Sequence, residues 1–387
     1  MDHPRIASDL TRALGRDAEP PGFLPLMEGL HQALELAGIQ ADRIQLPMAR
    51  NLGFRHPTLG LLLLNWSRDA GTSDSESMTH AQLDALQLPG VVGTPFERVV
   101  LHDEPWLRLD LGQTDGGFSS LTSLAERGFV DYCAVGLLMP SGLRQPLSIC
   151  SRQPMPSDVG QRLRSIEGLL ALAIYGAYRT SQALRMAQVY IGPDSGPRVL
   201  AGEIQRGSIR HLEAGIVFCD VRGFTAMSER LGAERVVEVV NQIFEIVEDE
   251  ARPHGGEILK FIGDALLLVF PVQGRPEQVA RGLVETARGS LERVAALALE
   301  LRLPLGVGFG AHIGEVVQGN VGTPERLDFT VMGPAVNVTS RLEGLCKPLA
   351  TPAVFSEAVS RHCPELAPAG LHALKGIAEP VPVWTLG

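Results

Sequence analysis

Two aspartates in the second half of this 387-residue chain have the surroundings of a cation site. Asp220 ends an apolar, strand-like stretch, residues 214–220. Asp264 lies in a tight turn between two more such stretches, residues 255–261 and 265–270. If the first strand and this hairpin are neighbours in one sheet, the two carboxylates converge. Such a pair suits Mg²⁺, which takes few protein ligands and binds substrate phosphates. By itself, Asp264 could equally be an ordinary turn residue.

The turn after Asp220 has the composition of an anion-binding turn. Residues 221–225, Val-Arg-Gly-Phe-Thr, lead from the strand toward a helix. Gly223 in such a turn leaves backbone N–H groups free to face an anion, and the helix dipole adds attraction. An acid directly before the turn would place a cation and these amides around the same polyphosphate.

The elements that position these residues follow the order β-α-β-β-α-β. Helices are expected at residues 228–252 and 276–301, and a strand with a glycine at every second position is expected at residues 304–312. This order is the split βαβ arrangement of ferredoxin-like α+β folds, in which the first strand and the central hairpin are neighbours. The alternating glycines predict a close backbone approach in the sheet of a dimer, not a phosphate loop.

The first half of the chain has a different organisation. A polar segment, residues 1–22, precedes an α+β domain at residues 23–157, in which residues 70–77 indicate an exposed loop. A long helix and linker, residues 158–197, lead into the last domain, residues 198–387. The near-heptad spacing of the helix is compatible both with packing against the first domain and with a dimer-forming signalling helix.

Composition argues against several classes of protein. The chain has 34 basic and 44 acidic residues, a net charge of −10, whereas a nucleic-acid binder is usually basic. Its longest apolar stretches fall short of the roughly 20 residues of a membrane-spanning helix. The N-terminus lacks the apolar region of a signal peptide, and the five scattered cysteines are typical of a reducing compartment. We therefore expect a cytoplasmic protein without a membrane span or a nucleic-acid partner.

Three blocks of sequence carry a resemblance to a known family. They are residues 218–225 (FCDVRGFT), 256–264 (GEILKFIGD) and 328–343 (DFTVMGPAVNVTSRLE). In this order and at this spacing they resemble the signature of the class III nucleotide cyclase catalytic domain, over about residues 213–386. The first domain with its terminal helix is distantly similar to GAF-type sensor domains.

The resemblance implies a metal and phosphate half of the site. Asp220 and Asp264, with the carbonyl of Val221, would hold two Mg²⁺ or Mn²⁺ ions. Gly223, Phe224 and Thr225, in the turn that follows the strand, would contact the substrate.

The resemblance also implies which base is bound. Lys260 and Thr330 match the two base-selecting positions, and guanylyl cyclases usually carry Glu and Cys or Ser there, so the implied substrate is ATP. Threonine at the second position is typical of the subgroup that includes bicarbonate-responsive enzymes, which makes bicarbonate a candidate regulator.

A second set of residues would act on the ribose and phosphates. Asn337 and Arg341 lie one helical turn apart and so share a face. In the family this Asn orients the ribose, and this Arg stabilises charge on the α-phosphate. Lys375 matches a position that often contacts the terminal phosphates. In the family the metal acids come from one subunit of a head-to-tail dimer, and the base selectors, the Asn and the Arg come from the other. A complete set in one chain therefore implies a homodimer with two composite sites.

The sequence thus predicts an adenylate cyclase that forms 3′,5′-cyclic AMP and pyrophosphate and is regulated by its N-terminal domain. A guanylate cyclase and a diguanylate cyclase are the enzymatic alternatives. Residues 255–257 (Gly-Gly-Glu) resemble part of the diguanylate cyclase signature, but the intact five-residue motif is absent. A non-catalytic nucleotide-sensing scaffold is the alternative from another class.

Overall fold

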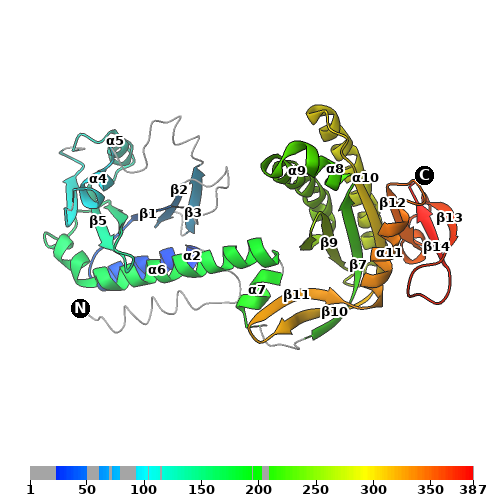
Figure 1. Ribbon diagram of the computed structural model, residues 1–387. Coiled ribbons are helices and arrows are strands. Elements are labelled where there is room, and N and C mark those ends of the chain that lie inside the picture. Colours follow the sequence, from blue (N-terminus) through cyan, green and yellow to red (C-terminus); the bar gives the residue numbers. More distant parts are fainter. Residues whose placement is uncertain are drawn as a thin grey trace. The chain divides into compact units, whose positions relative to one another are not determined.

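The chain divides into two compact units, Met1–Arg185 and Met186–Gly387 (Figure 1). The computed structural model describes residues 23–49, 61–68, 72–78, 93–102, 104–113, 116–193, 195–202 and 209–386. The predicted polar segment, residues 1–22, lies outside the described residues. No helix in the described ranges is both long and apolar enough to cross a membrane.

The first unit is built on an antiparallel sheet with helices on both faces. Its strand order is β3-β2-β1-β6-β5-β4. Helices α2 and α6 pack on one face, where alternate strand residues such as Ile44 and Ile149 are buried, and α4 and α5 pack on the other. The elements are α2 (Phe23–Leu36), β1 (Arg43–Ala49), β2 (Leu61–Ser67), β3 (Thr72–Met78), α4 (Pro95–Val100), β4 (Trp106–Asp110), α5 (Ser119–Glu126), β5 (Asp131–Leu138), β6 (Arg144–Ser151) and α6 (Val159–Ile191).

The loop prediction is wrong for residues 72–77, and residues 70 and 71 lie outside the described residues. Thr72–Met78 forms β3, which pairs antiparallel with β2 in a continuous register from Leu61↔Met78 to Ser67↔Thr72. An edge strand needs only the backbone groups of one neighbour, so its sequence can be polar and lack the apolar alternation by which strands are recognised.

The long helix is present as α6 and spans 33 residues. Its first half packs on the sheet of the first unit, because Val159, Leu163, Ile166 and Leu170 are all at most 1% exposed. The packing interpretation is therefore confirmed for this half. A signalling role for the helix stays a prediction.

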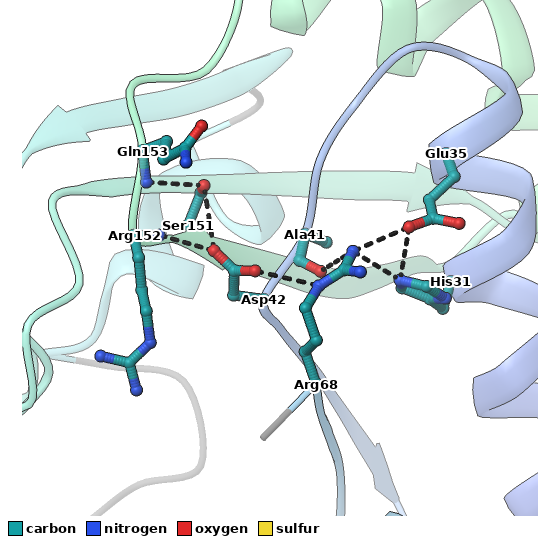
Figure 2. Close-up of polar contacts among 8 residues, drawn as sticks. All are labelled: His31, Glu35, Ala41, Asp42, Arg68, Ser151, Arg152 and Gln153. Atoms are coloured by element: carbon teal, nitrogen blue, oxygen red, sulfur yellow. Dashed lines mark hydrogen bonds and ion pairs between the residues drawn. The ribbon is translucent and has the colours of Figure 1, made fainter. Parts of the chain in front are cut away.

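A buried carboxylate joins three elements of the first unit (Figure 2). Asp42, 7% exposed, accepts hydrogen bonds from Arg68 Nε at 3.1 Å and from the backbone N–H of Arg152 at 2.7 Å, and it lies 3.3 Å from Ser151 Oγ. Arg68 also reaches Glu35 on α2, with 2.7 Å between Nη2 and Oε1. The network fixes the start of β1 to the ends of β2 and β6.

Replacing Asp42 by alanine is expected to lower the free energy of unfolding of the first unit by about 2 kcal/mol, because buried donors lose their acceptor. Glu35→Ala is the matched control. The Glu35 side chain is 46% exposed, so losing its ion pair with Arg68 should cost less than about 1 kcal/mol. Urea unfolding followed by the fluorescence of Trp66 and Trp106 measures both. Equal losses for the two variants would contradict the role given to Asp42.

The second unit has the predicted ferredoxin-like α+β fold. The strand order is β13-β14-β12-β10-β7-β9-β8, with β11 paired to β10. Its elements are α7 (Ser195–Leu200), β7 (Ile209–Val221), α8 (Phe224–Leu231), α9 (Ala233–Ala251), a short 3₁₀ helix (Arg252–His254), β8 (Glu257–Ile262), β9 (Ala265–Pro271), α10 (Pro276–Leu301), β10 (Val307–Thr323), β11 (Arg326–Met332), α11 (Pro334–Leu345), β12 (Ala353–Ser356), α12 (Glu357–Ser360), β13 (Ala367–His372) and β14 (Val381–Thr385).

Two predicted elements of this unit need correction. The helix expected at residues 228–252 is two helices, α8 and α9, separated at Gly232, whose φ of +75° a helix cannot contain. The strand expected at residues 304–312 begins at Val307 and continues to Thr323, because it forms a long ladder with β7. The helix expected at residues 276–301 is confirmed as α10.

Helices α9 and α10 cover one face of this sheet. Residues at helical spacing on α9, such as Val239, Ile243 and Val247, are buried against strand residues such as Cys219 and Phe270. The strand residues that alternate with these, among them Ile216 and Leu267, form a separate cluster on the other face. The two packed faces fix β7 in the middle of the sheet, and thereby fix its carboxyl end.

Candidate active site

The two aspartates lie at the same edge of the sheet. Asp220 is opposite Gly308 on β10 and opposite Ala265 on β9, the residue after Asp264. The backbone N–H of Val221 donates to the carbonyl of Asp264 at 3.2 Å. The pairing of β7 with the β8–β9 hairpin thus brings together two acids that are distant in the chain.

The electrostatics of this pair favour a bound cation. Asp220 is half-buried, with 34% of its side chain exposed. Burial raises the pKa of its carboxyl above the usual range, and the negative charge of Asp264 raises it further, while Arg222 opposes the rise. Two carboxylates that repel each other in a half-buried position are relieved by a cation between them.

A cavity of about 730 Å³ contains the acid pair and the turn that follows Asp220. Gly223 has a φ of +73°, the left-handed conformation that turns the chain into α8 at Phe224. Phe224 and Thr225 line the cavity with the two acids, and Lys347 and Thr351 lie in its wall. The cavity therefore joins a carboxylate pair to the start of a helix.

The donor set fits a hard divalent cation that keeps open positions. Among the described residues, no group of three or more His, Cys, Asp or Glu side chains is placed to hold a metal ion. Asp220 and Asp264 are thus a pair and not a closed cage, the arrangement that Mg²⁺ uses when substrate oxygens complete its shell.

An ion pair behind the acids is not evident from the sequence. Nη2 of Arg222 lies 2.9 Å from Oε1 of Glu343 on α11, and Nη1 lies 3.9 Å from Asp220. Nη2 of Arg222 and Oε1 of Glu343 are both buried. They form an ion pair, but their geometry is not that of a hydrogen bond. Burial raises the pKa of Glu343, and Arg222 counteracts this. The pair connects the turn after β7 to the helix that carries Asn337 and Arg341.

The predicted close approach at the alternating glycines is found inside one chain. A Cβ atom on Gly310 would clash with the backbone N of Glu343 and lie 2.6 Å from the carbonyl O of Thr339. A Cβ on Gly308 would clash with the Arg222 guanidinium. At Gly310, β10 therefore packs directly against the backbone of α11 in the same chain. The contacts of these glycines differ from the expected approach within the sheet of a dimer.

Gly310→Ala should lower the free energy of unfolding of the second unit by about 2–3 kcal/mol, because α11 must move away from β10. Gly344→Ala is the matched control. It lies in α11 with nothing within 4 Å of a built Cβ, so it should be neutral or stabilise the helix. Thermal unfolding of the two variants separates overpacking from a general effect of alanine on this helix. A loss in Gly344→Ala equal to that in Gly310→Ala would contradict this explanation.

Lys260 and Thr330, the predicted base selectors, lie close to a third polar residue. Lys260 on β8 forms an ion pair with Asp328 on β11. Thr330 is two residues further along the same strand, so its side chain is on the same face as that of Asp328. Asp328 was not singled out from the sequence, although its period-two spacing from Thr330 was a usable signal.

Asn337 and Arg341 lie apart from the acid cavity. Both are exposed on α11, whose opposite side buries Ala335, Thr339 and Leu342. Neither is among the described residues that line the cavity. Within one chain, then, the two predicted halves of the site do not meet.

Lys375 also lies away from the acid cavity. It is exposed beyond β13, next to the buried Leu374, and it is not among the described residues that line the cavity.

The fold and the site together define a ferredoxin-like domain with a carboxylate pair beside the turn at Gly223. Residues 208–354 match the family model of the adenylate and guanylate cyclase catalytic domain. An adenylate cyclase of Anabaena cylindrica is 35% identical over 169 residues, 42% of this chain and 33% of that protein. Adenylate cyclase 1 of Rhizobium meliloti is 35% identical over 174 residues, 42% of this chain and 26% of that protein.

Solved structures give similar matches. The adenylyl cyclase CyaB from P. aeruginosa has a TM-score of 0.43 and 26% identity, covering 46% of this chain and 96% of that chain. This chain covers no more than a third of the length of either curated relative above. Residues 208–354 are a class III nucleotide cyclase catalytic domain, a family whose members use divalent metal ions.

Proposed function

We propose that the second unit converts ATP into 3′,5′-cyclic AMP and pyrophosphate. The observation that carries the proposal is the cavity that joins Asp220 and Asp264 to the turn at Gly223, within a domain of the cyclase family. The family covers adenylate and guanylate cyclases. Two relatives named adenylate cyclase, and lysine and threonine at the base-selecting positions, favour ATP.

In the proposed reaction, the ribose 3′-oxygen forms a bond to the α-phosphorus, the bond from that phosphorus to the bridging oxygen breaks, and the hydroxyl proton passes to water. Asp220, Asp264 and the Val221 carbonyl would hold two Mg²⁺ or Mn²⁺ ions. When bound, such ions lower the pKa of the attacking hydroxyl and stabilise the charge of the leaving pyrophosphate.

The other residues bind and orient the substrate. The backbone at Gly223, Phe224 and Thr225 would face the polyphosphate. Lys260 and Thr330 would bind the adenine, with Lys260 placed by its ion pair to Asp328.

Two further residues act on the ribose and the α-phosphate. Asn337 would orient the ribose, and Arg341 would stabilise charge on the α-phosphate. Their separation from the acid cavity within one chain supports a homodimer in which each site takes one half from each subunit.

A regulatory role for the first unit is part of the proposal. Between its sheet and helices α4 and α5 is a cavity of about 330 Å³ with Arg43, Arg127, Tyr132 and Ser148 in its lining. No acidic residue is among the described residues that line it. An anionic small molecule is therefore the favoured class of regulator, and bicarbonate is one member of that class.

Product analysis of the purified full chain with ATP or GTP and Mn²⁺ tests the proposal. Cyclic AMP from ATP, with little product from GTP, is expected. Cyclic GMP from GTP alone would establish a guanylate cyclase instead, and cyclic diguanylate would establish the other enzymatic alternative. No product from either nucleotide, with tight ATP binding, would favour a nucleotide-sensing scaffold.

Base selection can be tested in the same assay. Lys260→Ala should lower kcat/KM for ATP by about 10–100-fold, because a charged hydrogen bond to the base is lost. Arg235→Ala, which removes an exposed ion pair with Glu238 on α9, is the control and should leave kcat/KM unchanged. An unaltered kcat/KM in Lys260→Ala would remove Lys260 from base recognition.

A further inference from the structure

The acid cavity has two cationic side chains in its lining, Arg222 and Lys347, and they differ in what they contact. Arg222 is neutralised by Glu343, 2.9 Å away, and also lies near Asp220. Lys347 is exposed, and in the described part of the chain no carboxylate forms an ion pair with it. Lys347 is therefore the cation of this cavity whose charge is still available to an incoming anion.

The backbone that carries Lys347 is fixed on both sides. The thiol of Cys346, 1% exposed, donates to the carbonyl of Phe309 on β10 at 3.2 Å. The N–H of Thr351 donates to the carbonyl of Cys346 at 3.0 Å, and the N–H of Ala350 donates to the carbonyl of Lys347 at 3.2 Å. The ammonium group thus projects from an anchored turn, so little backbone ordering is needed when it binds.

Lysine is rare in this chain. Of the 34 basic side chains, only Lys260, Lys347 and Lys375 are lysines. The other two match substrate-contacting positions of the family. A lysine presents a compact point charge with three donors, which suits phosphate oxygens, whereas arginine is suited to planar, bidentate partners. The third lysine lines the cavity of the metal acids, as expected if it too binds phosphate.

Charge balance points to the same role. A nucleoside triphosphate with two divalent ions is close to neutral, so Asp220 and Asp264 leave the occupied site negative. Because Glu343 cancels Arg222, the described lining of the cavity offers Lys347 as the remaining compensating charge.

We propose that Lys347 binds the terminal phosphates of the nucleotide in the metal half-site of its own chain. This inference rests on the proposed function, since it concerns the same site. It gives the turn that follows α11 a role in the site of its own chain, while the exposed face of that helix carries Asn337 and Arg341 for the partner subunit's site.

The test is binding of inorganic tripolyphosphate to the full chain in the presence of Mg²⁺, measured by calorimetry, together with steady-state kinetics. Lys347→Gln should weaken tripolyphosphate binding and raise KM for ATP, each by about 10–100-fold, with a much smaller change in kcat. The terminal phosphates already carry their negative charge before the reaction begins. Losing Lys347 should therefore weaken ATP binding and raise KM, with little change in kcat. Inhibition by adenosine 5′-monophosphate, which lacks the terminal phosphates, should be unchanged.

Two further variants make the result specific. Lys347→Arg keeps the charge and should retain most of the tripolyphosphate binding. Arg361→Gln removes an exposed charge whose partner is Glu357 and should bind as the unaltered chain does. Unchanged binding and KM in Lys347→Gln would overturn the proposal, as would an equal loss of binding for adenosine 5′-monophosphate. If the unaltered chain makes no cyclic product but binds tripolyphosphate through Lys347, the proposed function fails and the role of Lys347 stands.

Discussion

Asp264→Asn and Asp220→Asn are each expected to reduce cyclic AMP formation by about a thousandfold or more, equivalent to about 4 kcal/mol of transition-state stabilisation. Asparagine keeps the shape of the side chain but removes the charge that would bind the metal in the proposed site. The effect should be large for either residue, because the two carboxylates form one site at the ends of β7 and the β8–β9 hairpin. Initial rates at saturating ATP, and at the lowest Mn²⁺ concentration that saturates the unaltered chain, measure it.

The control for these substitutions is Asp249→Asn. Asp249 is a half-exposed acid on α9 that pairs with Arg293, with 3.2 Å between Nη2 and Oδ2. This variant removes the same charge from the same unit and should leave the rate within about twofold, since exposed ion pairs contribute little. Raising Mn²⁺ should restore part of the lost rate in Asp264→Asn if weakened metal binding is the cause. More than a tenth of the normal rate in both acid variants at low Mn²⁺ would contradict the metal role.

The convergence of Asp220 and Asp264 could be predicted because its signals are local. Asp220 ends an apolar run, and Asp264 lies in a Gly-Asp turn between two such runs. The apolar run that indicates a strand also shows where the strand ends. In a β-α-β-β-α-β order, the end of the first strand lies beside the turn of the central hairpin. The register of Asp220 opposite Ala265 fulfils this expectation.

The features that were missed depend on contacts between distant segments. The pairing of Arg222 with Glu343 requires knowing that α11 packs against β10 at Gly310, which no local pattern states. The polar strand β3 exists because β2 offers it a ladder, and its own sequence lacks a strand pattern. Propensity and periodicity describe an element by itself, so they fail where a neighbour determines the structure.

Mixing two inactive variants is expected to restore activity. Asp264→Ala removes the metal half-site, and Arg341→Ala removes the half that lies apart from the acid cavity. In a two-fold symmetric dimer with composite sites, a heterodimer of the two variants has one site with both defects and one with none. Random assembly from equal amounts makes half of the dimers heterodimers, so the mixture should reach about a quarter of the rate of the unaltered chain.

The pattern of recovery across pairs of variants identifies the composite site. A mixture of Asp220→Ala and Asp264→Ala should stay inactive. Both changes fall in the metal half-site, so no dimer in the mixture has an intact metal half-site. Co-expression with two affinity tags and sequential purification isolates the heterodimer of Asp264→Ala and Arg341→Ala, which should then reach about half the normal rate per dimer. A pure heterodimer without activity would mean that Arg341 acts in the site of its own chain. In that case α11 would have to turn its exposed face toward Asp220, against the buried contacts of Thr339 and Leu342 that now hold it. Recovery confined to pairs that combine the two halves can arise only if each site is completed by a second copy of the chain.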